Sequence, residues 1–525
     1  MKDLLKRFFV FSEKAVGDKR ASLLFCILAG AVGALPYFIE QLFIFTFLSL
    51  VFFFYVLLKR HANSKGLFLP YFCYYLGLYF PLYSFLSELY PYDRFGFDEN
   101  QATFVLICSC VLIPILHATV NSLIMMISKL FPNHILSLIG HSALWVVCEF
   151  VFTFGTLAFP WGGIAVSLTG FLPYLQTASL LGKYFITFVT VFSCSLIALS
   201  IIEKVKFRAL TGVALIVSNL LIGTILFFIP TQYKGSFEAA AVQGNALADD
   251  KWAMKNRKTI FERYISMTKE AAENGAELIL LPESAFPQSF SDGEYIHEAI
   301  AEITKEYGVT VLAGVRYLDY SEDYIDEYNS CIAVLPDGNL SSRYDKRHLV
   351  PFGEFIPFVD TLGELFPFLA DFNESSSSFI QGEEPVIIET VHGKIAPLVC
   401  FDSIFPAFSR EAINEGAGSI ALVTNDSWFF DSVGVYTHLR HSQLRAIENR
   451  RFVSRAANTG ISAFINEKGQ IIENSEPLVQ DTVYSTVYNI ESKSLYSIIG
   501  DSFVYISFLT VLMFVLFGLI KKNKK

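Results

Sequence analysis

Apolar residues form long, almost uninterrupted runs over the first 230 positions of the chain. A helix needs about 20 apolar residues to cross the hydrocarbon core of a bilayer. Seven runs near this length lie at about 21–38, 41–58, 66–88, 102–128, 135–156, 177–202 and 208–230, and an eighth lies at about 500–520. The pattern predicts a polytopic α-helical membrane domain with about eight spans.

The pattern changes between residues 231 and 495, where short β-type runs alternate with helical segments. We expect strands at 237–242, 277–281, 309–313, 331–335, 395–400, 420–424 and 461–465, and helices near 255–273, 293–306, 405–415 and 437–456. Turn signals at Pro336–Gly338 and Glu467–Gly469 predict hairpins, and Asn373–Ser378 is typical of an exposed loop. Strands alternating with helices indicate an α/β sandwich.

Three parts of the chain follow from these patterns. Residues 1–230 are expected to form a membrane domain with seven transmembrane helices, and 231–495 an α/β domain. Residues 496–525 are expected to add the last transmembrane helix and a basic tail.

Charge separates the same parts of the chain. Residues 231–495 hold 21 Lys and Arg against 39 Asp and Glu, whereas the remainder holds 19 against 11. The acidic part would repel phosphates, so nucleic acid is not an expected partner. Only 17% of all residues are charged, against about 25% in soluble domains. This composition argues against an ordinary soluble enzyme.

The basic residues of the short loops fall on one side of an eight-span arrangement. They are Lys2, Lys6, Arg7, Lys14, Lys19, Arg20, Lys59, Arg60, Lys65, Lys129, Lys204, Lys206, Arg208, Lys521, Lys522, Lys524 and Lys525. Because cytoplasmic loops carry the excess of Lys and Arg, both termini are expected in the cytoplasm. The 231–495 domain is then expected on the other side of the membrane.

Three segments of that domain carry residues suited to nucleophilic catalysis. Glu283 follows an expected strand, Cys400 ends another, and Lys346 lies in a charged run ahead of a Pro- and Gly-punctuated turn. In α/β folds, ligands bind beyond the carboxyl ends of strands. A Cys nucleophile needs a base to form the thiolate, which Glu283 could be. Lys346 could favour the thiolate and stabilise an oxyanion.

Each of these residues also has an ordinary structural explanation. A Cys at the end of a strand is commonly a small buried hydrophobe. A Glu there is commonly solvated or a helix cap, and a Lys in a charged run is commonly at the surface. Spacing alone leaves both explanations open.

The order of three strings carries a resemblance to a known family. The strings are Leu281-Pro-Glu-Ser284, Asp345-Lys-Arg-His-Leu-Val-Pro-Phe-Gly-Glu-Phe355 and a strand that ends in Cys400. They resemble the nitrilase (carbon–nitrogen hydrolase) superfamily. Together with the expected spans, the long string resembles the apolipoprotein N-acyltransferase family. Further matching strings are Val242–Asn245 with Trp252, Asn425–Phe429 and Phe159–Trp161.

The resemblance implies the site and its chemistry. It implies a four-layer α-β-β-α sandwich with Glu283 as base, Lys346 as oxyanion stabiliser and Cys400 as nucleophile. Glu354 matches a further essential acidic position and Trp252 a substrate-contacting Trp. The family commonly has Tyr and Glu after the nucleophile, whereas this chain has Phe401 and Asp402; this departure leaves the placing of donors and acceptors open.

The resemblance also implies the substrates. A phospholipid would donate an acyl chain to the Cys as a thioester, and a diacylglyceryl apolipoprotein would accept it on its α-amine. The expected location is the bacterial inner membrane, with the catalytic domain in the periplasm. We expect a monomer with no cofactor and no metal, since His438 and His441 lack a third ligand at a recognisable spacing. Trp161, Phe171 and Tyr174 are expected at the membrane interface, as anchors or as an acyl-chain portal.

Two alternatives remain at this point. One is a membrane-tethered nitrilase-type amidase that acts on a small amide with the same triad. The other is a non-catalytic membrane scaffold that binds lipidated proteins.

Overall fold

The computed structural model describes residues 18–61, 66–90, 97–132, 137–291, 293–320, 325–366, 368 and 379–523. Several expected features lie outside these residues: the basic residues before position 18, Lys65, Lys524 and Lys525, and the Asn373–Ser378 loop.

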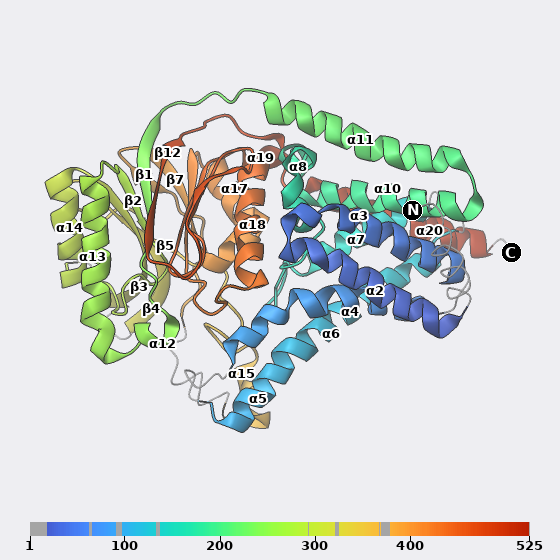
Figure 1. The fold of residues 1–525 in the computed structure, drawn as a ribbon, viewed down its shortest axis with the longest axis horizontal. Helices are drawn as coiled ribbons and strands as arrows, with labels where there is room; N and C mark the ends of the chain where they lie inside the picture. Colours follow the sequence, from blue (N-terminus) through green and yellow to red (C-terminus); the bar gives the residue numbers. More distant parts are fainter. Residues whose placement is uncertain are drawn as a thin grey trace.

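All eight apolar runs of the sequence form helices. They are α2 (Lys19–Phe38), α3 (Ile44–Val56), α4 (Phe68–Leu82), α5 (Glu99–Ile107) with α6 (Ile113–Met125), α7 (Ser137–Val151), α10 (Lys183–Glu203), α11 (Lys206–Phe228) and α20 (Ser502–Asn523). Among the described residues, six helices are long and apolar enough to cross a membrane. The other two runs give α4 and α7, which have 15 residues each and pack in the same bundle (Figure 1).

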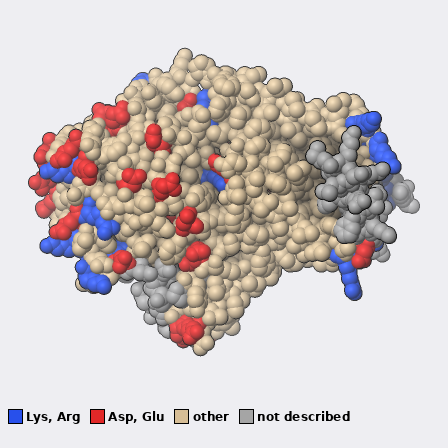
Figure 2. Space-filling view, viewed as in Figure 1, with Lys and Arg blue, Asp and Glu red and all other residues tan. Residues whose placement is uncertain are grey.

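Charge on the surface follows the division that the sequence predicts. Figure 2 shows charged side chains over the α/β part and at the far end of the bundle, with an almost uncharged surface between them. At that far end, exposed Lys204 follows α10, exposed Lys206 begins α11 and exposed Lys521 lies in the last turn of α20. The uncharged band is the surface that suits a lipid environment.

The α/β part contains two six-stranded sheets. The first has the order β12-β1-β2-β3-β4-β5 and the second β11-β10-β9-β8-β7-β6. The strands are β1 (Ser236–Gln243), β2 (Leu278–Leu281), β3 (Thr310–Tyr320), β4 (Ile325–Val334), β5 (Tyr344–Asp345), β6 (Ile388–Thr390), β7 (Gly393–Val399), β8 (Ser419–Thr424), β9 (Val453–Ala457), β10 (Ala463–Ile465), β11 (Ile471–Asn474) and β12 (Asp481–Tyr488). The strands β1 to β3 are parallel, and so are β7 to β9.

Helices cover the outer face of each sheet, which gives the expected four layers. Helices α13 (Arg257–Glu273) and α14 (Tyr295–Tyr307) cover the first sheet, and α17 (Pro406–Asn414) and α18 (Val433–Asn449) the second (Figure 1). Alternation along β1 shows the cause: Ala240 and Val242 face the helices, whereas Ala239 and Ala241 face the other sheet. A strand buried on both faces reads as a continuous apolar run.

The expected helix at 437–456 is wrong at its C-terminal end. Helix α18 ends before Arg450, whose φ of 53° is left-handed, and Val453–Ala457 forms β9, parallel to β8. Arg451 lies just before this strand and Arg455 lies within it, and both are fully buried. Because arginine is ordinarily exposed, the two residues interrupt the apolar pattern by which a buried strand is recognised. The turns at Pro336–Gly338 and Glu467–Gly469 join antiparallel strands, as predicted.

Helix α18 lies between the sandwich and the bundle. One continuous apolar core includes Leu444 and Ile447 of α18 and also residues of the membrane helices such as Phe53 and Trp145. Arg440 of α18 donates to the carbonyl oxygens of Pro36 and Tyr37 at the end of α2, each at 2.8 Å. The two parts are therefore packed and hydrogen-bonded together.

Candidate active site

The three segments that the sequence singles out meet at one edge of the sandwich. Glu283 follows β2, Lys346 follows β5 and Cys400 follows β7. The first two strands belong to one sheet and the third to the other. The site therefore lies where the ends of both sheets converge.

A buried lysine lies between two carboxylates. Lys346 Nζ lies 3.2 Å from Glu283 Oε1 and 2.9 Å from Glu354 Oε2, and its side chain is 1% exposed. The Asn329 amide donates to both carboxylates at 2.7 Å. Burial opposes the charge of Lys346, but Glu283 and Glu354 outweigh it and raise its pKa well above the usual value. The lysine is therefore a fixed ammonium group.

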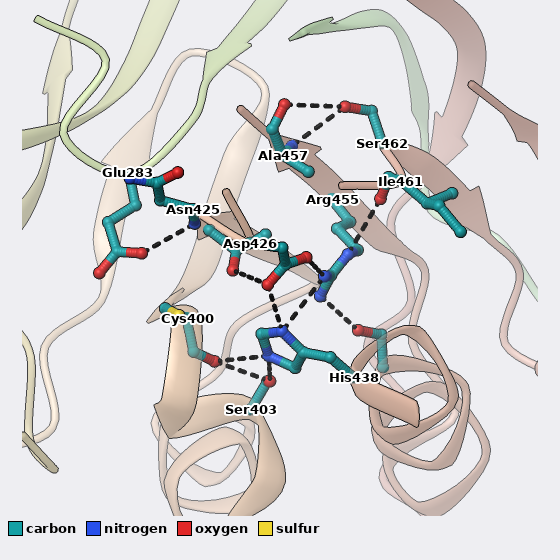
Figure 3. Close-up of polar contacts among 12 residues, drawn as sticks. Glu283, Cys400, Ser403, Asn425, Asp426, His438, Arg455, Ala457, Ile461 and Ser462 are labelled. Carbon is teal, nitrogen blue, oxygen red and sulfur yellow. Dashed lines mark hydrogen bonds and ion pairs between the residues drawn. The ribbon is translucent and has the colours of Figure 1, made fainter. Parts of the chain in front are cut away.

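The other oxygen of Glu283 is also held. The Asn425 backbone N–H donates to Glu283 Oε2 at 2.8 Å, and Asn425 comes directly after β8. Figure 3 shows Glu283 and Asn425 beside Cys400. Both oxygens of the Glu283 carboxylate thus have defined partners, which fixes its orientation.

Cys400 lies on a strained turn at the end of β7. Its φ is +48°, a conformation that costs roughly 1–3 kcal/mol for a residue other than glycine, and its side chain is partly exposed. Burial of the sulfur and the charge of Glu283 raise the pKa of the thiol, whereas Lys346 opposes the rise. The group is a thiol at neutral pH and needs a base to react.

Asp402 ties the turn that carries Cys400 to the segment that carries Lys346. It accepts hydrogen bonds from Tyr344 Oη at 2.8 Å and from the backbone N–H of His348 at 2.9 Å. Burial raises its pKa to about 6, although Lys346 and the hydrogen bonds oppose the rise. Asp402, which stands where the family commonly has the longer Glu, therefore has hydrogen-bond donors for both of its oxygens.

The neighbouring Phe401 contacts the membrane domain. Its ring stacks on Phe159 of the membrane domain at 5.6 Å and on His348 at 5.7 Å. Phe401 thus forms an aromatic contact between the turn that carries Cys400 and the bundle.

Trp252 lies beside the cluster and is 37% exposed. Its ring has Lys251 Nζ at 5.6 Å and the Arg316 guanidinium at 5.2 Å. Lys251 is buried and its ammonium lies 3.4 Å from the Glu283 backbone oxygen. Among the described contacts, Trp252 reaches the triad only through Lys251.

The expected interfacial aromatic residues are instead internal. Trp161 and Tyr174 are buried, and Phe171 packs partly buried against the same core. The Trp161 ring stacks on Phe85 and Phe159, and its backbone oxygen lies 3.0 Å from His441 Nε2 of α18. The expectation of lipid-facing anchors is wrong for Trp161 and Tyr174, because both are buried: Tyr174, in the short helix α8 (Leu172–Leu175), packs against Phe47 of the bundle. A role in an acyl-chain portal stays a prediction.

Two residues of the site carried no signal in the sequence. Asn329 lies within β4, and Lys251 lies beside Trp252 in a polar stretch. Neither belongs to a recognisable motif, since their role depends on contacts with residues far away in the chain.

Family models match both parts of the chain. The carbon–nitrogen hydrolase family model matches residues 238–489, and the apolipoprotein N-acyltransferase N-terminal domain model matches residues 29–196. Among solved structures, Saccharomyces cerevisiae Nit3, a nitrilase-superfamily member, aligns with a TM-score of 0.39 and 16% identity over 51% of this chain and 96% of its own.

Curated relatives match across both parts of the chain. The apolipoprotein N-acyltransferase of Geobacter metallireducens is 30% identical over 386 residues, which cover 70% of this chain and 71% of the relative. The protein of the same name from Borreliella burgdorferi is 30% identical over 405 residues, which cover 74% and 75%. With both family domains present and a relative of this identity aligned over most of its length, the chain belongs to the apolipoprotein N-acyltransferase family.

Proposed function

We propose that the protein transfers an acyl chain from a phospholipid to the N-terminal α-amine of S-diacylglyceryl-Cys in apolipoproteins. The observation that carries this proposal is the convergence of Glu283, Lys346 and Cys400 beside a membrane bundle. Both substrates are amphiphiles, and moving an acyl chain into water costs about 0.8 kcal/mol per CH₂. A site that adjoins the membrane domain avoids this cost.

In the first step, Cys400 attacks the phospholipid ester. Glu283 takes the thiol proton as the sulfur bonds to the ester carbonyl carbon, and Lys346 stabilises the oxyanion. The ester C–O bond then breaks, and the lysophospholipid oxygen leaves with the proton returned by Glu283. The acyl chain remains on Cys400 as a thioester.

In the second step, the apolipoprotein α-amine attacks the thioester carbon. Glu283 takes a proton from the amine and gives it to the departing sulfur, so that an amide and the free thiol result. Glu354 would hold Lys346 in place, Asp402 would align the segments of Lys346 and Cys400, and Trp252 would contact substrate at the rim. No cofactor enters either step.

The proposed location is the inner membrane of a bacterium, with the catalytic domain in the periplasm and the protein acting as a monomer. The basic residues at the far end of the bundle support this orientation, because they favour the cytoplasmic side.

Mass spectrometry of the purified protein mixed with phospholipid tests the proposal. The wild type should gain one acyl mass on Cys400, and Cys400→Ala should gain none while remaining folded. A lipoprotein that is acylated without any Cys400 adduct would overturn the mechanism. Release of ammonia or free acid from a small amide, without phospholipid, would favour the amidase alternative. Retained function in Cys400→Ala would favour the scaffold.

A further inference from the structure

A fully buried polar network lies beneath the turn that carries Cys400. His438, on α18, places Nδ1 2.8 Å from Asp426 Oδ1, and Nε2 2.9 Å from Ser403 Oγ and 3.1 Å from the Cys400 backbone oxygen. The side chains of Ser403, Asp426 and His438 are at most 2% exposed. Figure 3 shows the imidazole ring between Asp426 and the Cys400 carbonyl.

Arg455 anchors the acidic end of the network. Its Nη2 lies 2.6 Å from Asp426 Oδ2, and its Nε donates to the Ile461 carbonyl at 3.0 Å. Burial opposes ionisation of Asp426, but His438 and Arg455 outweigh it and lower its pKa to about 2. An ionised carboxylate only accepts hydrogen bonds, so the 2.8 Å contact makes His438 Nδ1 a donor.

The other end of the network meets the nucleophile residue itself. The Cys400 carbonyl accepts from Ser403 Oγ at 2.8 Å and faces His438 Nε2 at 3.1 Å. A carbonyl oxygen also only accepts. The Ser403 hydroxyl and His438 Nε2 therefore lie together against this oxygen, each within hydrogen-bond distance of it.

Two other uses of this cluster fit the geometry less well. Ligand atoms of Cys400, Asp426 and His438 lie within 4.8 Å of one another, a spacing suited to a metal ion, but the Arg455 guanidinium already occupies the Asp426 carboxylate as its cation. The Ser403–His438–Asp426 distances also match those of a serine triad. However, Ser403 is 0% exposed and its hydroxyl bonds the Cys400 carbonyl, so no substrate reaches it.

We propose that Asp426 and His438 form a positioning pair that fixes the Cys400 carbonyl and thereby holds the nucleophile in its left-handed turn. The proposal rests on the proposed role of Cys400 and deepens it. A strained conformation persists only where its surroundings over-determine it, and this network supplies that constraint from β8, β9 and α18. His438 touches neither substrate nor the reacting sulfur in this scheme.

Two substitutions of His438 separate positioning from general packing. His438→Gln places an amide nitrogen near the position of Nε2, where it can donate to the Cys400 carbonyl. His438→Asn keeps only a group near Nδ1. We expect His438→Asn to lower kcat for Cys400 acylation about tenfold or more, since small misplacements cost this much, with KM for phospholipid unchanged. His438→Gln should stay within about threefold of wild type.

A second measurement follows the thiol without phospholipid. The rate of Cys400 alkylation by iodoacetamide should fall in His438→Asn by the same factor as acylation, and Asp426→Asn should reproduce that fall. Tyr436→Phe is the matched control, because Tyr436 lies on the same helix and its hydroxyl makes an exposed contact with Asp431. It should leave both rates unchanged.

The outcomes separate this proposal from the proposed function. Equal rates in His438→Asn and His438→Gln, or wild-type rates in His438→Asn, overturn the positioning pair even where acyl transfer proceeds. If His438→Asn fails to fold, Asp426→Asn decides: wild-type alkylation in that variant overturns the pair. If phospholipid acylates no variant but the alkylation rates differ as expected, acyl transfer fails and the positioning pair stands.

Discussion

Lys346→Met removes the only cation that lies between Glu283 and Glu354 among the described contacts. Met preserves the length and apolar stem of the side chain but leaves the two carboxylates bridged by the Asn329 amide alone. The wild-type ammonium lies 3.2 Å from one carboxylate and 2.9 Å from the other. We expect two separate losses, one in stability and one in catalysis.

The size of each loss follows from burial and geometry. Removal of one partner from a buried ion pair costs about 3–5 kcal/mol, because the other charge is left uncompensated. Removal of an oxyanion donor costs about 10²–10³ in rate. Because Glu354 is the second carboxylate that Lys346 pairs with, the double variant Lys346→Met, Glu354→Gln removes the negative charge that the single variant leaves without a partner. It should recover most of the stability and none of the rate.

The assay combines thermal unfolding with single-turnover acylation in the same detergent. Acylation is followed as the added acyl mass on Cys400 after mixing with phospholipid. Lys394→Met is the control, because Lys394 pairs with Glu389 at 3.1 Å but is 49% exposed, and such surface pairs contribute about 0–1 kcal/mol. Recovery of acylation together with stability in the double variant would refute a catalytic role for Lys346 and leave it a structural one.

Two further substitutions test the surroundings of the triad. Asp402→Asn replaces one of the two oxygens that accept from Tyr344 Oη and His348 N–H by an NH₂ group, which then faces a donor. We expect a loss of about 1–3 kcal/mol in stability and slower acylation, and unchanged values would show that Asp402 is dispensable. Lys251→Met should stabilise the protein, because burial lowers the Lys251 pKa from 10.5 to about 7. Between pH 7 and 10.5 the unfolded wild type holds a proton on Lys251 that the folded protein lacks, so the stability of the wild type rises with pH. The advantage of Lys251→Met is therefore largest at or below pH 7 and falls by about 2 kcal/mol between pH 7 and 9. Thermal unfolding midpoints of Lys251→Met, measured over this pH range beside the exposed control Lys255→Met, check this prediction. A gain in midpoint that does not fall with pH would contradict it.

Local patterns in the sequence determine most of the fold. The eight apolar runs are visible because a helix that crosses a bilayer needs about 20 apolar residues, and the buried strands β1, β2 and β8 because burial on both faces requires continuous apolar residues. The edge strand β12, with its polar residues, and β9, with its buried Arg455, carry no such signal. A buried arginine reads as a surface residue until its partners are known.

The candidate site divides in the same way. The residue types of Glu283, Lys346 and Cys400, with the family resemblance, point to acyl transfer through a thioester before any coordinates are considered. The left-handed turn at Cys400 and the contact of Phe401 with Phe159 depend on packing between the bundle and the sandwich.

The sequence alone determined that this chain joins a membrane bundle to a nitrilase-type sandwich, because hydrophobic periodicity and motif order are properties of neighbouring residues. Only the tertiary structure decided that His438 serves the Cys400 turn, that Asp402 links it to the lysine segment, and that Trp161 is internal. These are relations between residues distant in the chain, and hydrogen bonds of fixed length form between them only once both sheets and α18 have packed.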